Sequence, residues 1–363
     1  MRAAILLAGT LALTAQESTI HTVDGLNRPL PGVEITVYCG NRPHHLSSDA
    51  NGHARGPFDK KTCISASVAK SGYTAYSSGF RDRMVLNRKL TAIDVERLIN
   101  TGTPESIREL LASDTPKLND AIFQFEHRLR PILRALLKDP YVTLPARDFL
   151  AMIADPEDIK QLVALPSPPG EYGWKERWRH PVATALIHPT TEAEWKFLER
   201  CVNYEFQDWW LVNGAIQSLQ LNATPRSKAI LESAGQKNPK VRERIQPAPA
   251  DPPTLAHPDL ETAAMTIAQT LGPKTWQGNK APRLNERADK ALIDLTFRTG
   301  SDYLVYTATF HKTNDSWTLR NVYETYQAFS PPPPPHPPRA PQRPPSHPPR
   351  PRLPRHDRRP GRH

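Results

Sequence analysis

Side chains that could do acid–base chemistry together are scarce in this sequence of 363 residues. Asp294 and His311, on two predicted strands near the C-terminus, are the best candidate pair, because a carboxylate and an imidazole can both move protons. Each also fits a solvent-facing position on an alternating strand. The sequence contains no His-Glu-x-x-His zinc helix, glycine-rich phosphate loop, Gly-x-Ser-x-Gly elbow or Cys-x-x-Cys pair. We therefore expect no enzyme activity, no catalytic residue, no bound metal and no cofactor.

The three cysteines have different surroundings in the sequence. Cys39 ends one predicted strand and Cys63 begins another, and in an oxidising compartment two such cysteines of one small module can pair. A disulfide that closes a loop of about 25 residues would contribute about 3 kcal/mol; two buried thiols are the alternative. Cys201, in a predicted helix, is expected to be a core thiol. The adjacent His44 and His45 could bind a metal, but in a polar loop we expect them to be solvated.

The N-terminus predicts export. Met1 and Arg2 precede a short apolar run that ends in small residues, which is typical of a secretory signal peptide spanning residues 1–15. A buried first strand is the alternative. No other stretch approaches the roughly 20 apolar residues of a transmembrane helix. We expect a secreted or periplasmic protein of the cell envelope, and not an integral membrane protein.

The formal charge of +10 is concentrated at the C-terminus. Residues 330–363 hold eight arginines against Asp357 alone, a balance of +7, so the rest carries +3. A nucleic-acid-binding domain would show a basic face in its folded part, so we expect no nucleic acid as partner. The segment is rich in proline and lacks a hydrophobic core, which predicts a disordered, polyproline-like tail able to contact anionic surfaces or proline-reading domains. The alternative is that this segment is the product of a GC-rich gene read in the wrong frame.

Residues 91–244 read as short amphipathic helices in pairs. Thr103 and Asp155 are expected to cap helices that begin at Pro104 and Pro156, and similar openings are predicted at Pro189 and Pro225. These four prolines are 52, 33 and 36 residues apart, and intervals in the thirties fit arrays of helix pairs. The first interval is longer because it contains an extra predicted helix near 122–137. The apolar runs at 149–153, 182–186 and 216–219 resemble HEAT-like repeats. That resemblance implies a helical solenoid with a concave binding surface and no particular chemistry.

Residues 18–90 predict a small all-β sandwich, with alternating strands at 33–38 and 64–69. The turns Asp24-Gly25, Pro31-Gly32, Asn51-Gly52 and Gly72-Tyr73 separate them. These motifs, with Ser48-Asp49 and Lys70-Ser71, resemble the carboxypeptidase-regulatory-like, transthyretin-like domain. The resemblance covers about 70 residues and implies an accessory or adhesive module rather than a catalytic one.

The remaining folded part follows a proline-rich linker at 245–258. Residues 259–329 predict a small α+β module, with a helix at 260–271 and three antiparallel strands at 291–298, 303–312 and 317–328. One face of this meander is expected to pack on the helix, as in antiparallel sheets with a single buried face. The fold class is therefore multidomain: sandwich, helical array, α+β module and disordered tail.

Five of the seven tryptophans lie in the helical array, and two of them are adjacent. Trp209 and Trp210 cannot face one core equally, because neighbouring helical residues point about 100° apart. With the charged Glu205 and Asp208 beside them, they are the predicted partner-binding site, since tryptophan often anchors interfaces. Trp195 is expected in the core. We expect an exported non-catalytic scaffold that binds a protein; the alternative is an accessory or sensing subunit of an envelope hydrolase, such as a peptidase.

Overall fold

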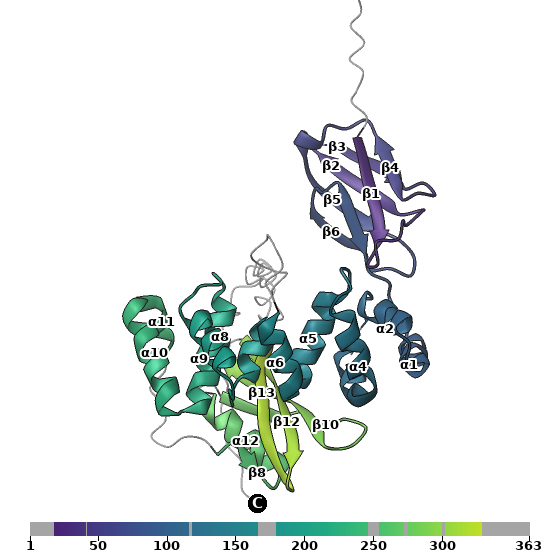
Figure 1. Cartoon of the computed structure of the whole chain (residues 1–363). Coiled ribbons are helices and arrows are strands. Elements are labelled where there is room, and N and C mark those ends of the chain that lie inside the picture. The colour runs from purple at the N-terminus through teal and green to yellow at the C-terminus, as the bar shows by residue number, and fades with distance from the viewer. Residues whose placement is uncertain are drawn as a thin grey trace, which may run out of the picture.

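The computed structural model describes residues 18–40, 42–115, 118–165, 179–245, 254–271, 275–299 and 302–328. The predicted signal peptide and tail, most of the predicted linker, and Trp174 and Trp178 lie outside these described residues. Along the chain, an N-terminal pair of β-sheets is followed by a layer of helices and then by a long curved sheet that lies against the helices (Figure 1).

The N-terminal strands form two sheets that enclose one core. Their orders are β4-β1-β7 and β3-β2-β5-β6, with β1 at Ser18–Asp24, β2 at Glu34–Cys39, β3 at Arg42–Ser47, β4 at His53–Gly56, β5 at Cys63–Ala69, β6 at Tyr76–Gly79 and β7 at Arg83–Leu86. The predicted strands at 33–38 and 64–69 are confirmed as β2 and β5. Their alternation is that of a half-buried sheet, with Ile35 opposite Val68 in the core. At Gly52, with φ +73°, an added Cβ would lie 2.4 Å from the Thr22 carbonyl oxygen, so this turn requires glycine.

The middle of the chain is helical. Its helices are α1 Ala92–Thr101, α2 Pro104–Leu111, α3 Leu118–Gln124, α4 Glu126–Leu136, α5 Thr143–Ile153, α6 Pro156–Ala164, α7 Arg179–Ala185, α8 Glu192–Val202, α9 Trp209–Asn222, α10 Pro225–Lys237 and α11 Pro239–Arg244. Buried residues from Leu90 to Val241 make one continuous hydrophobic cluster through this layer. Successive helices therefore share a core, as the amphipathic pattern predicts.

Three of the four predicted helix starts are correct. Pro104, Pro156 and Pro225 each occupy the first turn of a helix, after the capping residues Thr103, Asp155 and Thr224. The fourth is wrong, because α8 begins three residues after Pro189. Thr191 there accepts a hydrogen bond from the backbone of Glu194, whose carboxylate accepts from the backbone of Thr191 in return. This capping box satisfies two backbone donors at once and so fixes the start of the helix.

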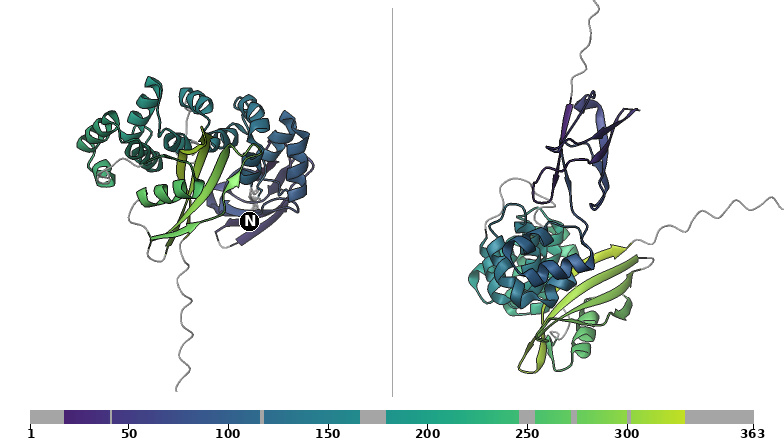
Figure 2. Two further views of the ribbon diagram at one scale, coloured as in Figure 1. Left: turned by 90° about the horizontal axis from the view of Figure 1, so that it is seen from below. Right: turned by 90° about the vertical axis from the view of Figure 1, so that its right-hand side faces the viewer.

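The C-terminal part contains α12 (Leu260–Thr270) and, within the described residues, a six-stranded sheet curved as a half-barrel (Figure 2). Its strands are β8 Ala256–His257, β9 Thr275–Asn279, β10 Arg283–Leu284, β11 Lys290–Thr299, β12 Asp302–Thr313 and β13 Ser316–Ala328. The predicted helix and three long antiparallel strands are confirmed as α12 and β11–β13. β8 to β10 were not predicted, because segments of two to five residues are too short to show a period.

This sheet is covered on both faces, not on one. Ala291, Ile293 and Leu295 pack in a cluster with residues of α12. On the opposite face, Leu292 and Tyr323 belong to the core of the helical layer. The left view of Figure 2 shows the sheet between α12 and the arc of helices. The C-terminal module therefore shares its core with the helical array.

Side chains of the sheet satisfy the end of helix α5. The last carbonyl groups of a helix have no partner within the helix. The carbonyls of Ala151, Met152 and Ile153 accept hydrogen bonds from Asn321 Nδ2 (3.0 Å), Thr309 Oγ1 (2.9 Å) and His311 Nε2 (2.9 Å). All three donor side chains are buried. The polar face of the sheet is thus used to hold the helical layer.

A buried ion pair lies beside these contacts. Lys290 Nζ donates to Glu126 Oε1 at 2.8 Å, and both side chains are nearly inaccessible, at 9% and 2% exposed. Asn285 also donates to this carboxylate, at 3.2 Å. A buried charge is tolerated only when it is paired, so Lys290 of β11 and Glu126 of α4 depend on the docking of sheet and helices.

Candidate functional site

The predicted partner-binding residues cluster where α8 turns into α9. This turn is tight, and Tyr204 (φ 62°) and Gln207 (φ 54°) both adopt the left-handed conformation that non-glycine residues rarely take. The Asp208 side chain accepts a hydrogen bond from the backbone of Trp210 at 2.8 Å and so caps α9. The structure therefore brings Glu205, Asp208, Trp209 and Trp210 together in one compact segment.

The two adjacent tryptophans have different roles, as the helical geometry predicts. Trp209 is half-buried against the helical core. Its ring stacks on Tyr204, with centroids 4.5 Å apart, and the Arg244 guanidinium lies 4.5 Å from its centroid. Trp210 is 55% exposed. It is the only tryptophan among the exposed large hydrophobic residues in the part of the chain that the structure describes.

The charged groups of the turn are held by neighbouring residues. Arg200 donates to Glu205 at 2.8 Å, and its guanidinium lies 4.7 Å from the centroid of the buried Phe206 ring. The two side chains of this ion pair are each about half exposed. An exposed pair contributes little to stability, so Glu205 can exchange Arg200 for a cation of a partner. The site offers an exposed indole beside an accessible carboxylate.

Trp195, which the sequence predicts in the core, is half-buried and packs against the same helical core. The Arg226 guanidinium covers its ring at 4.7 Å and pairs with Glu192 at 2.8 Å. Its indole is therefore occupied on one face by the core and on the other by an arginine. Such cation–π contacts contribute about 0.5–1 kcal/mol at exposed positions.

The candidate acid–base pair, Asp294 and His311, does not come together. Lys290, not Asp294, lies opposite His311, and Asp294 lies opposite Thr307. The four-residue offset along the strand separates the pair by about 13 Å. Asp294 accepts from Arg283 (2.6 Å) and Thr307 (2.9 Å).

The expectation that Asp294 and His311 face solvent is also wrong. Each is only 8% exposed, because the helical layer covers this face of the sheet. Burial, followed by the charge of Lys290, lowers the pKa of His311 to about 4. The neutral ring donates from Nε2 to the Ile153 carbonyl. The sequence gives no sign of this burial, because the polar positions of β11–β13 alternate as they would in a row of residues that faces solvent.

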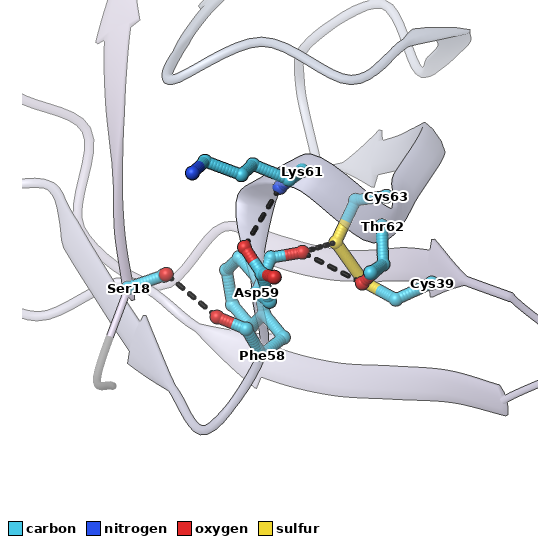
Figure 3. The surroundings of a disulfide bond; sticks show 7 residues. All are labelled: Ser18, Cys39, Phe58, Asp59, Lys61, Thr62 and Cys63. Carbon is cyan, nitrogen blue, oxygen red and sulfur yellow. Dashed lines mark hydrogen bonds between the residues drawn. A yellow bond between two sulfur atoms is a disulfide. The ribbon is translucent and has the colours of Figure 1, made fainter. Parts of the chain in front are cut away.

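The disulfide between Cys39 and Cys63 is present and joins β2 to β5 (Figure 3). Next to it, the Ser18 hydroxyl donates to the Phe58 carbonyl at 2.6 Å and so fixes the start of β1. Cys201 is buried in α8, 1% exposed, and takes no part in the disulfide. His44 and His45 lie on β3, and His45 Nδ1 is 3.1 Å from the Thr36 hydroxyl.

The described residues contain neither a cluster of metal ligands nor a membrane-spanning helix. In that part of the chain, no group of three or more histidine, cysteine or acidic residues could hold a metal ion. Likewise, no helix there has the length and apolar character needed to cross a membrane. Comparison of the whole chain with protein-family models, curated proteins and solved structures finds no match.

Proposed function

We propose that this protein is an exported, non-catalytic scaffold that binds another protein through the turn between α8 and α9. The observation that carries the proposal is the 55% exposure of Trp210 beside a packed neighbour, Trp209. Leaving a large apolar ring in water has a free-energy cost that a partner can relieve. The packed neighbour and the cap at Asp208 fix the position of the ring, which reduces the entropy lost on binding.

Export and the two family resemblances are part of the same proposal. The disulfide supports an oxidising location such as the periplasm or the exterior. The two N-terminal sheets with glycine turns support a transthyretin-like accessory module, and the shared core of α1–α11 supports a HEAT-like array. Such arrays function by binding partners on an extended surface and do not need a reactive centre.

The test compares two single substitutions in the full chain. Trp210→Ala should weaken partner binding by about 2 kcal/mol or more, which is about 30-fold, and should leave urea denaturation unchanged. Trp209→Ala should lower the free energy of unfolding by about 3 kcal/mol, because it opens a cavity against Tyr204 and the core. The control is Ile93→Ala, at a 78% exposed position on α1.

Binding is measured to the protein that the immobilised chain captures from an envelope extract. Equal capture by the parent chain and Trp210→Ala would exclude this turn as the site. Recovery of a single hydrolase, lost with Trp210→Ala, would instead favour the accessory-subunit function. Loss of capture with Ile93→Ala but not with Trp210→Ala would place the binding surface on the first helices.

A further inference from the structure

Two histidines of the N-terminal sheets lie directly opposite each other on an outer surface. His21 of β1 and His53 of β4 are partners in the antiparallel pairing of these neighbouring strands (Figure 1). Their neighbours Ile20 and Ala54 are fully buried in the core, so the two imidazole rings project from the other face of the sheet. His21 is exposed and His53 is half-buried. The rings meet edge to face, with centroids 4.5 Å apart, so the pair is in contact and open to solvent.

The backbone brings these two side chains as close together as an antiparallel sheet allows. The His21 amide donates to the Asp82 carbonyl at 2.7 Å, toward β7, and the amide of the next residue, Thr22, donates to the Gly52 carbonyl of the β4 side at 2.7 Å. Hydrogen-bonded and non-hydrogen-bonded pairs alternate along such a ladder, so His21 and His53 form a non-hydrogen-bonded pair, in which the Cα atoms are only about 4.5 Å apart. The Thr22 hydroxyl also donates to the Gly52 carbonyl, at 3.1 Å. The fold therefore fixes the spacing of the two histidines.

Two imidazoles at this spacing have the donor chemistry of a site for a first-row divalent cation. Imidazole nitrogen suits Zn²⁺, and a Zn–N bond is about 2.0–2.1 Å long, so two nitrogens bound to one ion lie about 3.3 Å apart. Rotation about the broad χ2 torsion turns both rings from their edge contact toward a shared ion. Within the described ranges no third histidine, cysteine or acidic side chain joins them in a metal-binding group. Water would fill the remaining positions, as in zinc sites that keep an open position.

The charges around the pair do not exclude a cation. Arg55 follows His53 by two residues on the same face of β4, and Arg83 lies on the other neighbouring strand, β7. The Arg83 guanidinium is directed to Asn27, where it donates to Oδ1 at 2.7 Å. Opposing these cations, the exposed carboxylate of Asp49 accepts a hydrogen bond from the backbone of His53 at 2.9 Å, and this bond lowers the pKa of Asp49. A negative charge therefore lies beside the pair.

The other two histidines of these sheets are not arranged in this way. His44 and His45 are adjacent on β3 and so point to opposite faces. The His44 ring lies 5.9 Å from that of Phe58, whereas His45 Nδ1 is 3.1 Å from the Thr36 hydroxyl. Adjacent positions on one strand cannot share an ion, whereas opposite positions on two strands can. His45 is exposed and is therefore a matched control for His21.

We propose that His21 and His53 together bind Zn²⁺ as an open two-histidine site on the outer face of the sheet β4-β1-β7. The site is separate from the α8–α9 turn, and the inference does not rest on the proposed function. An ion held there cross-links β1 to β4. It stabilises the folded state, because the unfolded chain does not hold the two rings together.

The first test follows the reactivity of each histidine toward diethylpyrocarbonate in the full chain as Zn²⁺ is added. A ring bound to the ion has no free nitrogen lone pair, because its other nitrogen carries the proton. His21 and His53 should therefore be protected at least fivefold and with the same half-saturation, while His45 stays reactive. Peptide mapping by mass spectrometry separates these histidines from those of residues 330–363.

The two rings must also depend on each other. In His21→Asn the protection of His53 should disappear, and in His53→Asn that of His21 should disappear, whereas His45→Asn should change neither. Protection of one ring alone, or protection that survives loss of the other ring, would overturn the proposal. Protection of neither would show that the pair is an aromatic contact only.

The second test measures urea unfolding of the full chain with free Zn²⁺ at ten times the Kd found in the first titration. The ion should lower the unfolding equilibrium constant about elevenfold in the parent chain and in His45→Asn, because a ligand that binds only the folded state acts by this factor at that concentration. His21→Asn changes an exposed residue, so it should fold as the parent chain does but show no such shift. An equal shift in the parent chain and in His21→Asn would place the ion at other histidines and overturn the proposal.

Discussion

His311 should make the stability of the protein depend on pH between about 4 and 6.5. Its neutral ring caps α5 by donating to the Ile153 carbonyl, and burial holds its pKa at about 4 against an ordinary value of 6.5. The folded protein therefore binds fewer protons at this site than the unfolded chain within that window. The stabilisation is complete above pH 6.5 and is lost as the pH falls to about 4.

The magnitude follows from that depression of the pKa. The difference between a pKa of about 4 and the ordinary value of 6.5 corresponds to about 3 kcal/mol. Below pH 4 the charged imidazole would still face Lys290 and Arg320, which both oppose it, while Asp155 favours it. Acidification should therefore loosen the contact between β12 and the end of α5.

The assay is urea denaturation at pH 4 to 7 of the parent chain and of His311→Gln. Glutamine can donate from Nε2 to the same carbonyl but does not titrate, so other titrating groups cancel in the difference. The parent chain should lose about 3 kcal/mol relative to His311→Gln between pH 7 and pH 4. Parallel curves would show that His311 titrates normally, and the account of its burial would be wrong.

Two further predictions concern groups buried at other contacts. Lys290→Met should lower the free energy of unfolding, measured by urea denaturation, by about 3–5 kcal/mol, because it leaves the Glu126 carboxylate buried without its cation. The control is Lys312→Met, at an exposed position, which should change the free energy of unfolding by less than about 0.5 kcal/mol. Removal of the disulfide by Cys39→Ser with Cys63→Ser should cost about 3 kcal/mol for a sequence separation of 24 residues, and peptide mapping should find Cys201 alkylated only after denaturation. Alkylation of Cys39 in the native parent chain would contradict the disulfide.

The elements of the fold could be predicted where the sequence has a clear period. β11 to β13 and α12 follow from alternation and from apolar spacing, and the caps at Thr103 and Asp155 follow from their side chains. The start of α8 was misplaced because two signals competed. Pro189 fits a first helical turn, but the capping box of Thr191 and Glu194 is the stronger one.

The docking of the sheet on the helices could not be predicted from the sequence. Thr309, His311 and Asn321 look like residues of a solvent-facing row, because an alternating pattern only shows which positions share a face. That face is covered because these side chains donate hydrogen bonds to the last carbonyl groups of α5, which have no partner within the helix. These carbonyl groups lie 157 to 170 residues away in the chain. For the same reason Asp294 and His311 were considered as a catalytic pair, although the strand register keeps them apart.

This docking also determines where a partner can bind. Since the face of the helical layer next to β11–β13 is buried in the protein itself, it does not offer an open concave surface to a partner there. α9 is buried along most of its length, and its side toward the sheet is covered by β13 at Gln217. Two turns earlier the same side carries Trp210, which is 55% exposed. This side of α9 therefore extends beyond the part that β13 covers, and the exposed part of the Trp210 ring is where the proposed partner protein would bind.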